Sequence, residues 1–555
     1  MSAIPAGIRL PQQARILRTH CKDSPLNPYP EKSQYCDRRQ KGCMGRLALL
    51  SVSDKTGIVD FARQLVEEFE FELISSGGTA KTLQDAGIPV TKVSDYTGSP
   101  EILGGRVKTL HPRIHGGILA RRDVAQDRAE LENNEIRAID LVVVNLYPFE
   151  ETIAQPNVTL ADAIEQIDIG GPTLLRASAK NFAHLTVLCK PERYDGYLKE
   201  LRDNKGEVSP EFRQARAAEG FSMTMAYDRA ISNYFASLQP SEEQPAQFTL
   251  SGKQHQSLRY GENPHQSAAW YRTGTQGWTS ATQLQGKALS YNNLVDLEAA
   301  RRIITEFPAN EPAAAVLKHT NPCGVAVSNS LVDAYEKAFA ADSVSAFGGI
   351  VALNQPIDVA TAKVLKKTFL ECIVAPECEL EAREILASKS NLRVLLLPDL
   401  QQGEPQTVKV IAGGFLLQAA DDRAADPDTW QIATQKQPTP LQMAELSFAW
   451  KVAKHVKSNA IVVTRDRVTL GVGAGQMNRV GAAKIALEQA GEQAKGATLA
   501  SDGFFPFDDS VRTAAAAGIT AIIQPGGSIR DKDSIQAADE LGVVMVLTGV
   551  RHFLH

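Results

Sequence analysis

The sequence has few cysteines, no long hydrophobic run and no excess of either charge. Seven cysteines among 555 residues, without repeated CxxC spacing, exclude the disulfide framework of a small secreted protein and favour a reducing, cytoplasmic compartment. The apolar runs at 141–144, 395–397 and 543–547 stop far short of the roughly 18 residues that a membrane helix needs. A net charge of −5 provides no general basic field for nucleic acid or for an anionic membrane. We therefore expect a soluble protein that binds neither.

The composition is that of ordinary globular material. Forty glycines and 28 prolines, with 43% hydrophobic and 22% charged residues, exclude collagen-like repetition and general disorder. At roughly 100–200 residues per domain, the length predicts about three or four structural units.

Residues 1–43 differ from the rest of the chain. They hold eight Lys or Arg, three Asp or Glu and five prolines, so this segment carries +5 and the remaining chain −10. It lacks a periodic apolar face. We interpret it as a disordered extension or a non-native start-site artefact; an Arg-rich transit peptide remains an alternative.

From Met44 onward, short β-branched runs alternate with amphipathic stretches. Ile58, Ala62, Leu65 and Phe69 have helical spacing, and strands are predicted at 46–51, 69–74, 89–93, 140–145 and 185–189. A polar stretch with two prolines at 239–256 predicts a linker. Beyond it, strands are predicted at 314–318, 348–353, 460–464, 521–524 and 543–547, separated by alanine-rich helices. The pattern is typical of α/β layers, with a largely parallel sheet in the first region and a larger α/β region after the linker.

Two strand-to-helix junctions in the first region are suited to a phosphate. Residues 51–57 (SVSDKTG) and 75–79 (SSGGT) place hydroxyls, a lysine and glycines at predicted helix starts. Unpaired N–H groups and the positive end of the helix dipole favour an anion there. Either junction alone fits ordinary N-capping by Ser53 or Thr79, whereas the two together favour a phosphate site.

Further polar groups follow apolar runs in the first region. Lys108, Tyr147, Asp168 and Lys180 could stabilise an oxyanion and transfer protons, although solvated loop charges are the simpler interpretation of each residue alone. His111 and His115 have metal-like spacing, but Pro112 disfavours a helix through both and no acidic partner lies between them. We expect no metal there.

The second region contains Lys318 and His319 where a predicted strand meets a Pro-Cys-Gly turn. An imidazole near its working pKa beside an ammonium group can exchange protons with a substrate. Cys323 has no assignable base and no partner cysteine, so we interpret it as a small buried residue, neither nucleophile nor zinc ligand.

Eleven strings in one order resemble those of the bifunctional purine-synthesis enzymes that combine aminoimidazole carboxamide ribonucleotide (AICAR) transformylase with inosine monophosphate (IMP) cyclohydrolase. The strings are SVSDKTG, SSGGTAKTL, GGRVKTLHP, NLYPF, IDIGG, LRYGENPHQ, KHTNPCG, SAFGG, GVGAGQMNRV, SDGFFPFDDSV and RHFLH. The resemblance covers the chain from Met44 to His555.

This resemblance implies a methylglyoxal-synthase-like cyclohydrolase domain at 44–248. It also implies a transformylase region at 251–555, built from two cytidine-deaminase-like subdomains that have lost their zinc. The enzyme would perform the last two steps of purine synthesis as a homodimer whose transformylase sites use both subunits. It would transfer a formyl group from 10-formyltetrahydrofolate to AICAR and then close the ring, with no catalytic metal.

The resemblance also implies the site residues. The IMP phosphate would be held by Ser51, Ser53, Lys55, Thr56, Ser76, Gly77, Gly78 and Thr79. Arg106, Lys108, Tyr147, Asp168 and Lys180 would surround the closing ring. Lys318 and His319 would be the catalytic pair of the transformylase, and its nucleotide pocket would contain Arg259, Tyr260, Asp342, Asn459, Arg479, Phe504, Asp509 and Arg551.

Two other classes remain open from the residues alone. If the protein were a hydrolase or deaminase with a single activity, the presence of two domains suited to bind phosphate would be unexplained. The metal ligands that such an enzyme needs are also not found in the sequence. A nucleotide-sensing protein would need the phosphate junctions but not Lys318 and His319.

Overall fold

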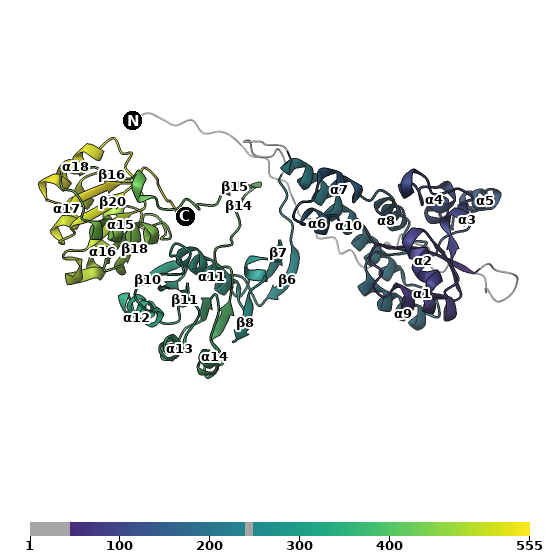
Figure 1. The fold of residues 1–555 in the computed structure, drawn as a ribbon, viewed down its shortest axis with the longest axis horizontal. Coiled ribbons are helices and arrows are strands. Elements are labelled where there is room, and N and C mark those ends of the chain that lie inside the picture. The colour runs from purple at the N-terminus through teal and green to yellow at the C-terminus, as the bar shows by residue number, and fades with distance from the viewer. Residues whose placement is uncertain (1–44, 239–247) are drawn as a thin grey trace, which may run out of the picture. The chain divides into compact units, whose positions relative to one another are not determined.

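A computed structural model describes residues 45–238 and 248–555 of the chain. The chain divides into two compact units, Met1–Ala246 and Gln247–His555, whose elements are labelled in Figure 1. The segment 1–43, interpreted above as an extension, lies outside the described residues. No helix within the two described ranges is long and apolar enough to cross a membrane.

The first unit contains a five-stranded sheet of order β3-β2-β1-β4-β5. All neighbouring strands are parallel, which confirms the predicted parallel sheet. The strands are β1 (Arg46–Ser51), β2 (Phe71–Ser75), β3 (Thr91–Lys92), β4 (Leu141–Val144) and β5 (Thr186–Leu188). Chain order reverses direction beside β1, and in such sheets ligands bind at the carboxyl ends of the strands around this switch point.

Helices cover both faces of this sheet. Side chains from α1, α2 and α9 pack with Leu50 and Val143 on one face, and side chains from α4, α8 and α10 pack with Leu49 and Val142 on the other. The helices are α1 (Ile58–Glu67), α2 (Gly77–Asp85), α3 (Val93–Thr97), α4 (Pro112–Leu119), α5 (Ala125–Asn133), α6 (Phe149–Ile153), α7 (Leu160–Glu165), α8 (Gly170–Lys180), α9 (Tyr194–Asp203) and α10 (Pro210–Ser237).

The second unit is organised around a 12-stranded sheet. Its order is β16-β21-β20-β19-β17-β18-β10-β9-β11-β12-β13-β8. Read outward from the central β10–β18 pair, the two halves contain equivalent strands in the same order. The two central strands are antiparallel, with Ala326 opposite Val468. The sheet therefore consists of two repeats joined edge to edge.

The two repeats match element for element. The first contains β8 (Thr282–Gln285), α11 (Tyr291–Ile304), β9 (Ala313–Lys318), β10 (Asn321–Val327), α12 (Leu331–Ala341), β11 (Ile350–Leu353), α13 (Val359–Leu365), β12 (Cys372–Ala375), α14 (Leu380–Ala387) and β13 (Arg393–Leu396). The second contains β16 (Gln431–Ile432), α15 (Pro440–Ala453), β17 (Ile461–Arg465), β18 (Val468–Gly473), α16 (Arg479–Ala490), β19 (Thr498–Ser501), α17 (Asp509–Ala516), β20 (Ala521–Gln524), α18 (Asp531–Glu540) and β21 (Val544–Leu547).

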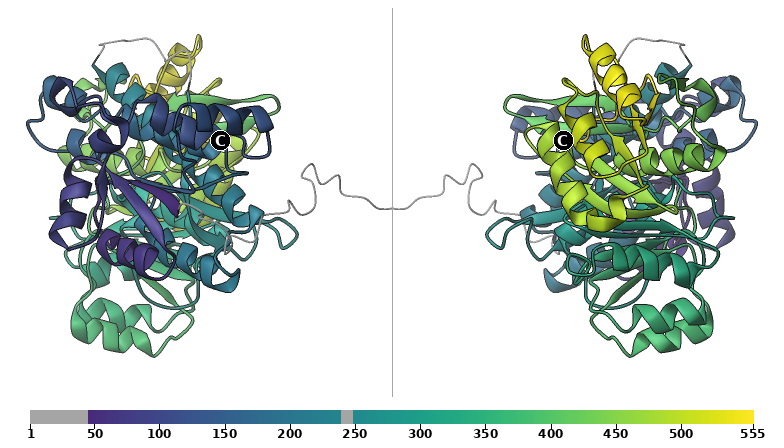
Figure 2. Two further views of the ribbon diagram at one scale, coloured as in Figure 1. Left: turned by 90° about the vertical axis from the view of Figure 1, so that its right-hand side faces the viewer. Right: turned by 90° about the vertical axis from the view of Figure 1, so that its left-hand side faces the viewer.

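Helices lie on both faces of the long sheet. Residues of α11 and α15 share one hydrophobic core on one face, whereas α12–α14 and α16–α18 form separate cores with the opposite face. In the right-hand view of Figure 2 the yellow and yellow-green helices of the second repeat lie together over its strands. Because α11 and α15 share a core, the repeats are joined by packing as well as by strand pairing.

Two sequence interpretations need correction. The predicted linker 239–256 overlaps β6 (Lys253–Leu258), which pairs with β7 (Ala268–Arg272); β6 is largely exposed, so it lacks the apolar alternation by which strands are recognised. The strand predicted at 89–93 is shorter, because Val93 already begins α3. A second hairpin, β14 (Gln406–Ile411) with β15 (Gly414–Ala419), was not predicted.

Candidate active sites

A pocket of about 560 Å³ lies at the carboxyl ends of the strands in the first unit. Its lining includes Ser51 and Val144, the last residues of β1 and β4, and Ser76, which follows β2. The switch point of the sheet and the pocket therefore coincide.

The N-terminus of α2 lines the pocket, and the ammonium groups of two lysines lie near it. A Cβ added to Gly77 would lie 3.1 Å from Lys108 Nζ, and one added to Gly78 would lie 3.6 Å from Lys55 Nζ. Gly77 also has φ of +50°, which favours glycine. Two cations at the positive end of a helix dipole form a strong anion site.

Thr79 supports this wall rather than facing it. Its hydroxyl donates to Val52 O at 2.9 Å and accepts from Val52 N at 3.1 Å, and the residue is buried. The side chain thus ties α2 to the loop after β1. Asn145, which follows β4, also holds this loop, because its Oδ1 accepts hydrogen bonds from Ser53 N and Asp54 N.

The lining of the pocket also contains Asp168 and Tyr147. Asp168 Oδ1 accepts from Gly171 N at 2.8 Å, and a Cβ on Gly171 would lie 2.3 Å from Asp168 Oδ2, so only glycine fits there. Burial raises the pKa of Asp168, and backbone N–H groups of Gly171, Gly170 and Tyr147 oppose that rise. A carboxyl with a raised pKa beside a pocket is suited to proton transfer.

In the second unit, Lys318 and His319 lie at the hairpin between β9 and β10. Lys318 Nζ donates to Phe347 O at 2.9 Å and to Gly348 O at 3.2 Å, while His319 is exposed at the turn. Asn321 Oδ1 accepts from Lys457 N at 3.0 Å, which joins the hairpin to the loop before β17.

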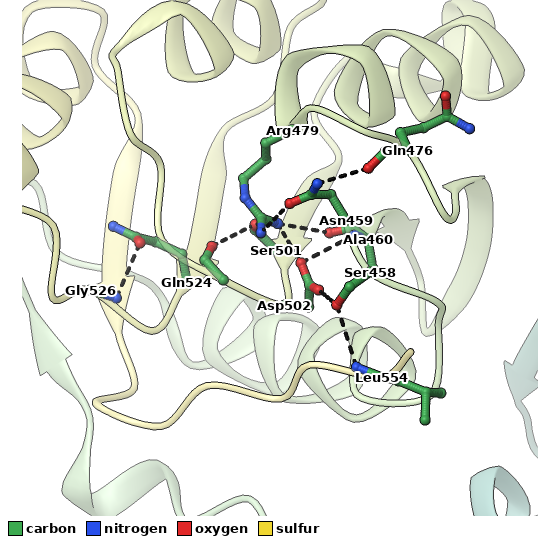
Figure 3. Close-up of polar contacts among 11 residues, drawn as sticks. Ser458, Asn459, Ala460, Gln476, Arg479, Ser501, Asp502, Gln524, Gly526 and Leu554 are labelled. Carbon is green, nitrogen blue, oxygen red and sulfur yellow. Dashed lines mark hydrogen bonds and ion pairs between the residues drawn. The ribbon is translucent and has the colours of Figure 1, made fainter. Parts of the chain in front are cut away.

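That loop leads into a buried polar cluster around Arg479 (Figure 3). Arg479 donates to Asn459 Oδ1 and Ser501 Oγ, each at 2.8 Å, and forms an ion pair with the fully buried Asp502. Ser458 donates to the same carboxylate and its Oγ accepts from Leu554 N at 3.4 Å. The cluster fixes the C-terminal segment that contains Arg551.

Comparison with known proteins assigns the family. The model of the AICARFT/IMPCHase bienzyme matches residues 178–489, and that of the MGS-like domain matches residues 57–173. The chain is 74% identical over 517 residues to the bifunctional purine biosynthesis protein PurH of Gloeothece citriformis, covering 92% of this chain and 100% of the relative. The PurH protein of Rippkaea orientalis is 73% identical with the same coverage. A solved structure titled "Crystal structure of ForH" is 38% identical, covers 35% of this chain and all of its own, and has a TM-score of 0.32.

The chain belongs to the AICARFT/IMPCHase bienzyme family. This confirms the predicted α/β architecture with an MGS-like N-terminal domain. It also confirms the predicted function: the chain is a bifunctional AICAR formyltransferase and IMP cyclohydrolase, which acts on nucleotide and folate substrates in the last two steps of purine synthesis.

The structure gathers most of the residues expected for the cyclohydrolase of this family. The predicted residues in the pocket lining are Ser51, Ser53, Lys55, Ser76, Gly77, Gly78, Thr79, Arg106, Lys108, Tyr147 and Asp168. Thr56 and Lys180 are not in that lining. Thr56 instead bonds to Asp54 Oδ1 through its N–H and hydroxyl. Lys180 is exposed at the last turn of α8, about 15 Å along the helix from Gly170 at 1.5 Å per residue.

The transformylase residues are gathered less completely. Asn459 and Arg479 are in direct contact, and Arg551 stacks on Phe553 with 4.2 Å from guanidinium to ring centre. Arg259 stacks on Tyr260 at 5.4 Å, and Asp342 accepts from Ser345 N and Gln489 Nε2. Phe504 is partly exposed, and Asp509 begins α17 and accepts from Ser510 N.

Sequence reasoning missed several residues that shape these sites. Asn145 and Asp502 each follow a buried strand directly, which is a signal that could have identified them. Glu101 pairs with Lys108 at 3.5 Å and Glu165 pairs with Arg106, and neither has a local signal in the sequence. Burial raises the pKa of Cys323 to about 12, so its thiol is protonated at neutral pH, as expected for a residue that is not a nucleophile.

Proposed function

We propose that the pocket of the first unit closes the purine ring and that the β9–β10 hairpin of the second unit transfers the formyl group. The observation that carries the first assignment is the pair of ammonium groups, Lys55 and Lys108, at the start of α2, in the same pocket lining as the half-buried carboxyl of Asp168. The phosphate would bind at the helix start, where Ser51, Ser53, Ser76 and the backbone N–H groups of Gly77, Gly78 and Thr79 converge.

Ring closure then requires three changes at the substrate. The carboxamide nitrogen bonds to the formyl carbon and gives up a proton, the formyl oxygen takes up negative charge and then two protons, and that oxygen leaves as water while the formamide nitrogen gives up the second proton. Lys108 would stabilise the developing negative charge. Asp168, aided by Tyr147, would transfer the protons. Arg106 would flank the ring. Lys180, which lies at the last turn of α8 and outside the pocket lining, remains a proposed member of the proton-transfer set.

For formyl transfer we propose His319 as the base and Lys318 as the acid. The 5-amino group of AICAR is a poor nucleophile because its lone pair is delocalised, so a base and close positioning must both contribute. His319 would accept a proton as the amine attacks the formyl carbon of 10-formyltetrahydrofolate, and Lys318 would protonate N10 as it departs. Asn459, Arg479, Arg551, Arg259, Tyr260, Asp342, Phe504 and Asp509 would bind the nucleotide or organise its pocket. Neither step calls for a metal.

We further propose that the repeats of the second unit are cytidine-deaminase-like subdomains and that the enzyme acts as a cytoplasmic homodimer. The matched order of helices and strands in the two repeats supports the first point. The reduced thiols of Cys189, Cys323, Cys372 and Cys378 support a reducing compartment.

One set of assays tests this division of labour. His319→Ala should abolish formyl transfer from 10-formyltetrahydrofolate to AICAR and leave the cyclisation of supplied formylated nucleotide intact. Asp466→Ala, at the same turn position of the second repeat, is the matched control and should retain both activities. Near-normal formyl transfer by His319→Ala would overturn the assignment.

A further inference from the structure

The turn that contains His319 has an unfavourable backbone. His319 and Thr320 have φ of +51° and +65°, and Lys318 and Asn321 pair on either side. This is the two-residue hairpin turn that favours asparagine and glycine. A β-branched threonine in the left-handed region is a marked outlier, and such outliers persist only where surrounding contacts hold them.

One of these contacts comes from a neighbouring helix. Thr320 N donates to Asp296 Oδ1 at 2.8 Å, and Asp296 is the sixth residue of α11. The helix itself is held at its start by a capping box formed by Ser290 and Asn293. Burial raises the pKa of Asp296, whereas the Thr320 N–H and the charges of His319 and Lys318 lower it. The geometry thus joins Asp296 to the turn through the backbone of Thr320, the residue after His319.

The second repeat contains the same arrangement at the equivalent place. Its hairpin turn, Asp466 and Arg467, has φ of +55° and +57°, and Arg467 N donates to Glu445 Oε2 at 2.8 Å. Glu445 is the sixth residue of α15, a helix of 14 residues like α11, and it also begins with a capping box. Burial also raises the pKa of Glu445.

The two turns differ in what they present. In the second repeat Asp466, a residue type that tolerates positive φ, takes the first position, and Arg467 pairs with Glu311. In the first repeat a histidine and a threonine take these positions, and the histidine is exposed. The brace is thus common to both repeats, and only the first repeat uses it to hold a proposed catalytic group.

We propose that Asp296 is a positioning residue for formyl transfer, which fixes the His319–Thr320 turn by accepting the Thr320 N–H. The proposal rests on the proposed role of Lys318 and His319. Asp296 acts through the turn and not on the substrate, so its loss should change the turnover number more than the Michaelis constant for AICAR.

The test measures formyl transfer and cyclisation in a series of full-length variants. Asp296→Ala should lower kcat for formyl transfer by about tenfold to a hundredfold, the scale expected when a reacting group is misplaced by about 1 Å. Asp296→Asn should stay near the wild-type kcat, because its amide oxygen can accept the same hydrogen bond. Glu445→Ala is the matched control, since it removes the equivalent brace in the other repeat, and it should leave kcat for formyl transfer within about threefold of wild type, the scatter expected for a change without a catalytic role.

A double variant distinguishes turn positioning from a general structural role. Glycine adopts positive φ without strain, so Thr320→Gly in the Asp296→Ala background should recover part of the lost kcat. Cyclisation, which belongs to the other unit, should be unchanged throughout. If Asp296→Ala does not fold, Asp296→Ser takes its place, because its hydroxyl is too short to reach Thr320 N.

The outcomes separate this proposal from the function on which it rests. If His319→Ala retains formyl transfer, the catalytic assignment itself is wrong. If His319→Ala is inactive but Asp296→Ala has the wild-type kcat, only the positioning role is overturned. An Asp296→Asn variant as slow as Asp296→Ala, a double variant that recovers nothing, or an equal loss in Glu445→Ala would also overturn it.

Discussion

Asn354 and Asp502 occupy the same position in the two repeats, directly after β11 and β19, and each accepts a hydrogen bond from a backbone N–H where the adjacent strand begins. Ala313 N donates to Asn354 Oδ1 at 2.8 Å, and Ala460 N donates to Asp502 Oδ1 at 3.1 Å. The Asn354 amide also donates to backbone carbonyls. Asp502 instead pairs with Arg479. At this position the two repeats thus differ in one group, an amide in the first repeat and a carboxylate in the second.

Asp502→Asn should weaken AICAR binding in the transformylase. The amide can still accept from Ala460 N, but Arg479 loses its buried counter-charge and hence its fixed orientation. A hydrogen bond to a charged group contributes about 1.5–3 kcal/mol, so we expect the Michaelis constant for AICAR to rise about tenfold to a hundredfold, with cyclisation unchanged. An unaltered Michaelis constant would show that Arg479 does not depend on this ion pair.

Lys108 and Lys55 should affect cyclisation in different ways. Lys108 is proposed to stabilise charge that develops only as the ring closes, so Lys108→Ala should lower turnover by about a hundredfold to a thousandfold. Lys55 is proposed to bind a phosphate whose charge does not change, so Lys55→Ala should mainly raise the Michaelis constant. Steady-state cyclisation of the formylated nucleotide measures both constants. The reverse pattern would refute the division, and no effect in either variant would place the site elsewhere.

Asp168→Asn should abolish cyclisation and make the first unit more stable at neutral pH. Because burial raises the pKa of Asp168 above its ordinary value of 3.8, its carboxyl favours the folded state at low pH, and this contribution is lost as the pH rises through the folded-state pKa. At neutral pH the ionised carboxylate therefore destabilises the first unit. We expect Asp168→Asn to lose cyclisation. At pH 7 its melting temperature should rise by about 2–4 °C for each kcal/mol of unfolding free energy that the substitution restores. This difference between the variant and the wild type should disappear towards about pH 4. A lower melting temperature at pH 7 would contradict this.

Glu306 should matter for the stability of the second unit. Its Oε1 accepts from Lys454 Nζ at 2.8 Å and His455 Nε2 at 3.0 Å. Burial alone would raise the pKa of Glu306, but these partners lower it to about 2. The group therefore stabilises the fold above about pH 4.5, and this contribution is lost as the pH falls towards 2.

Glu306→Ala would leave the Lys454 ammonium buried without its counter-charge, at a cost of about 3–5 kcal/mol. Urea unfolding followed by a probe in the second unit measures this cost. Glu381→Ala, on an exposed helix surface, is the control and should change stability by less than about 0.5 kcal/mol. Equal stability of the two variants would show that the buried pair contributes nothing.

The sequence predicted part of the buried strands, where β-branched runs bounded by turns have few alternatives, but it did not predict the equally buried β12 and β19. The strand at 46–51 was located to the residue, and that at 521–524 likewise. The exposed strand β6 was missed, since its side chains face water on most positions and carry no apolar signal. Hairpin β14–β15 was also missed. It contains apolar residues such as Val410 and Phe415, but these side chains are exposed and not part of a buried strand face.

The sites could be predicted only in part because side-chain roles depend on contacts between distant segments. Lys55 and Lys108 both reach the start of α2, whereas the sequence placed only Lys55 at the phosphate and Lys108 beside the closing ring. Thr79, expected to bind phosphate through its hydroxyl, uses that hydroxyl for Val52. The bond between Asp296 and Thr320 spans 24 residues, and it became visible only with the fold.

The antiparallel seam between β10 and β18 relates two copies of one architecture by an approximate two-fold axis. A single repeat on its own would leave a strand edge and the apolar surface of α11 open to water, and both are self-complementary under such an axis. Two unconnected repeats could therefore pair through these edges only by a bimolecular association, which loses translational and rotational entropy. A covalent connection turns that encounter into an intramolecular one at a high effective concentration, so each half stays assembled however dilute the enzyme becomes.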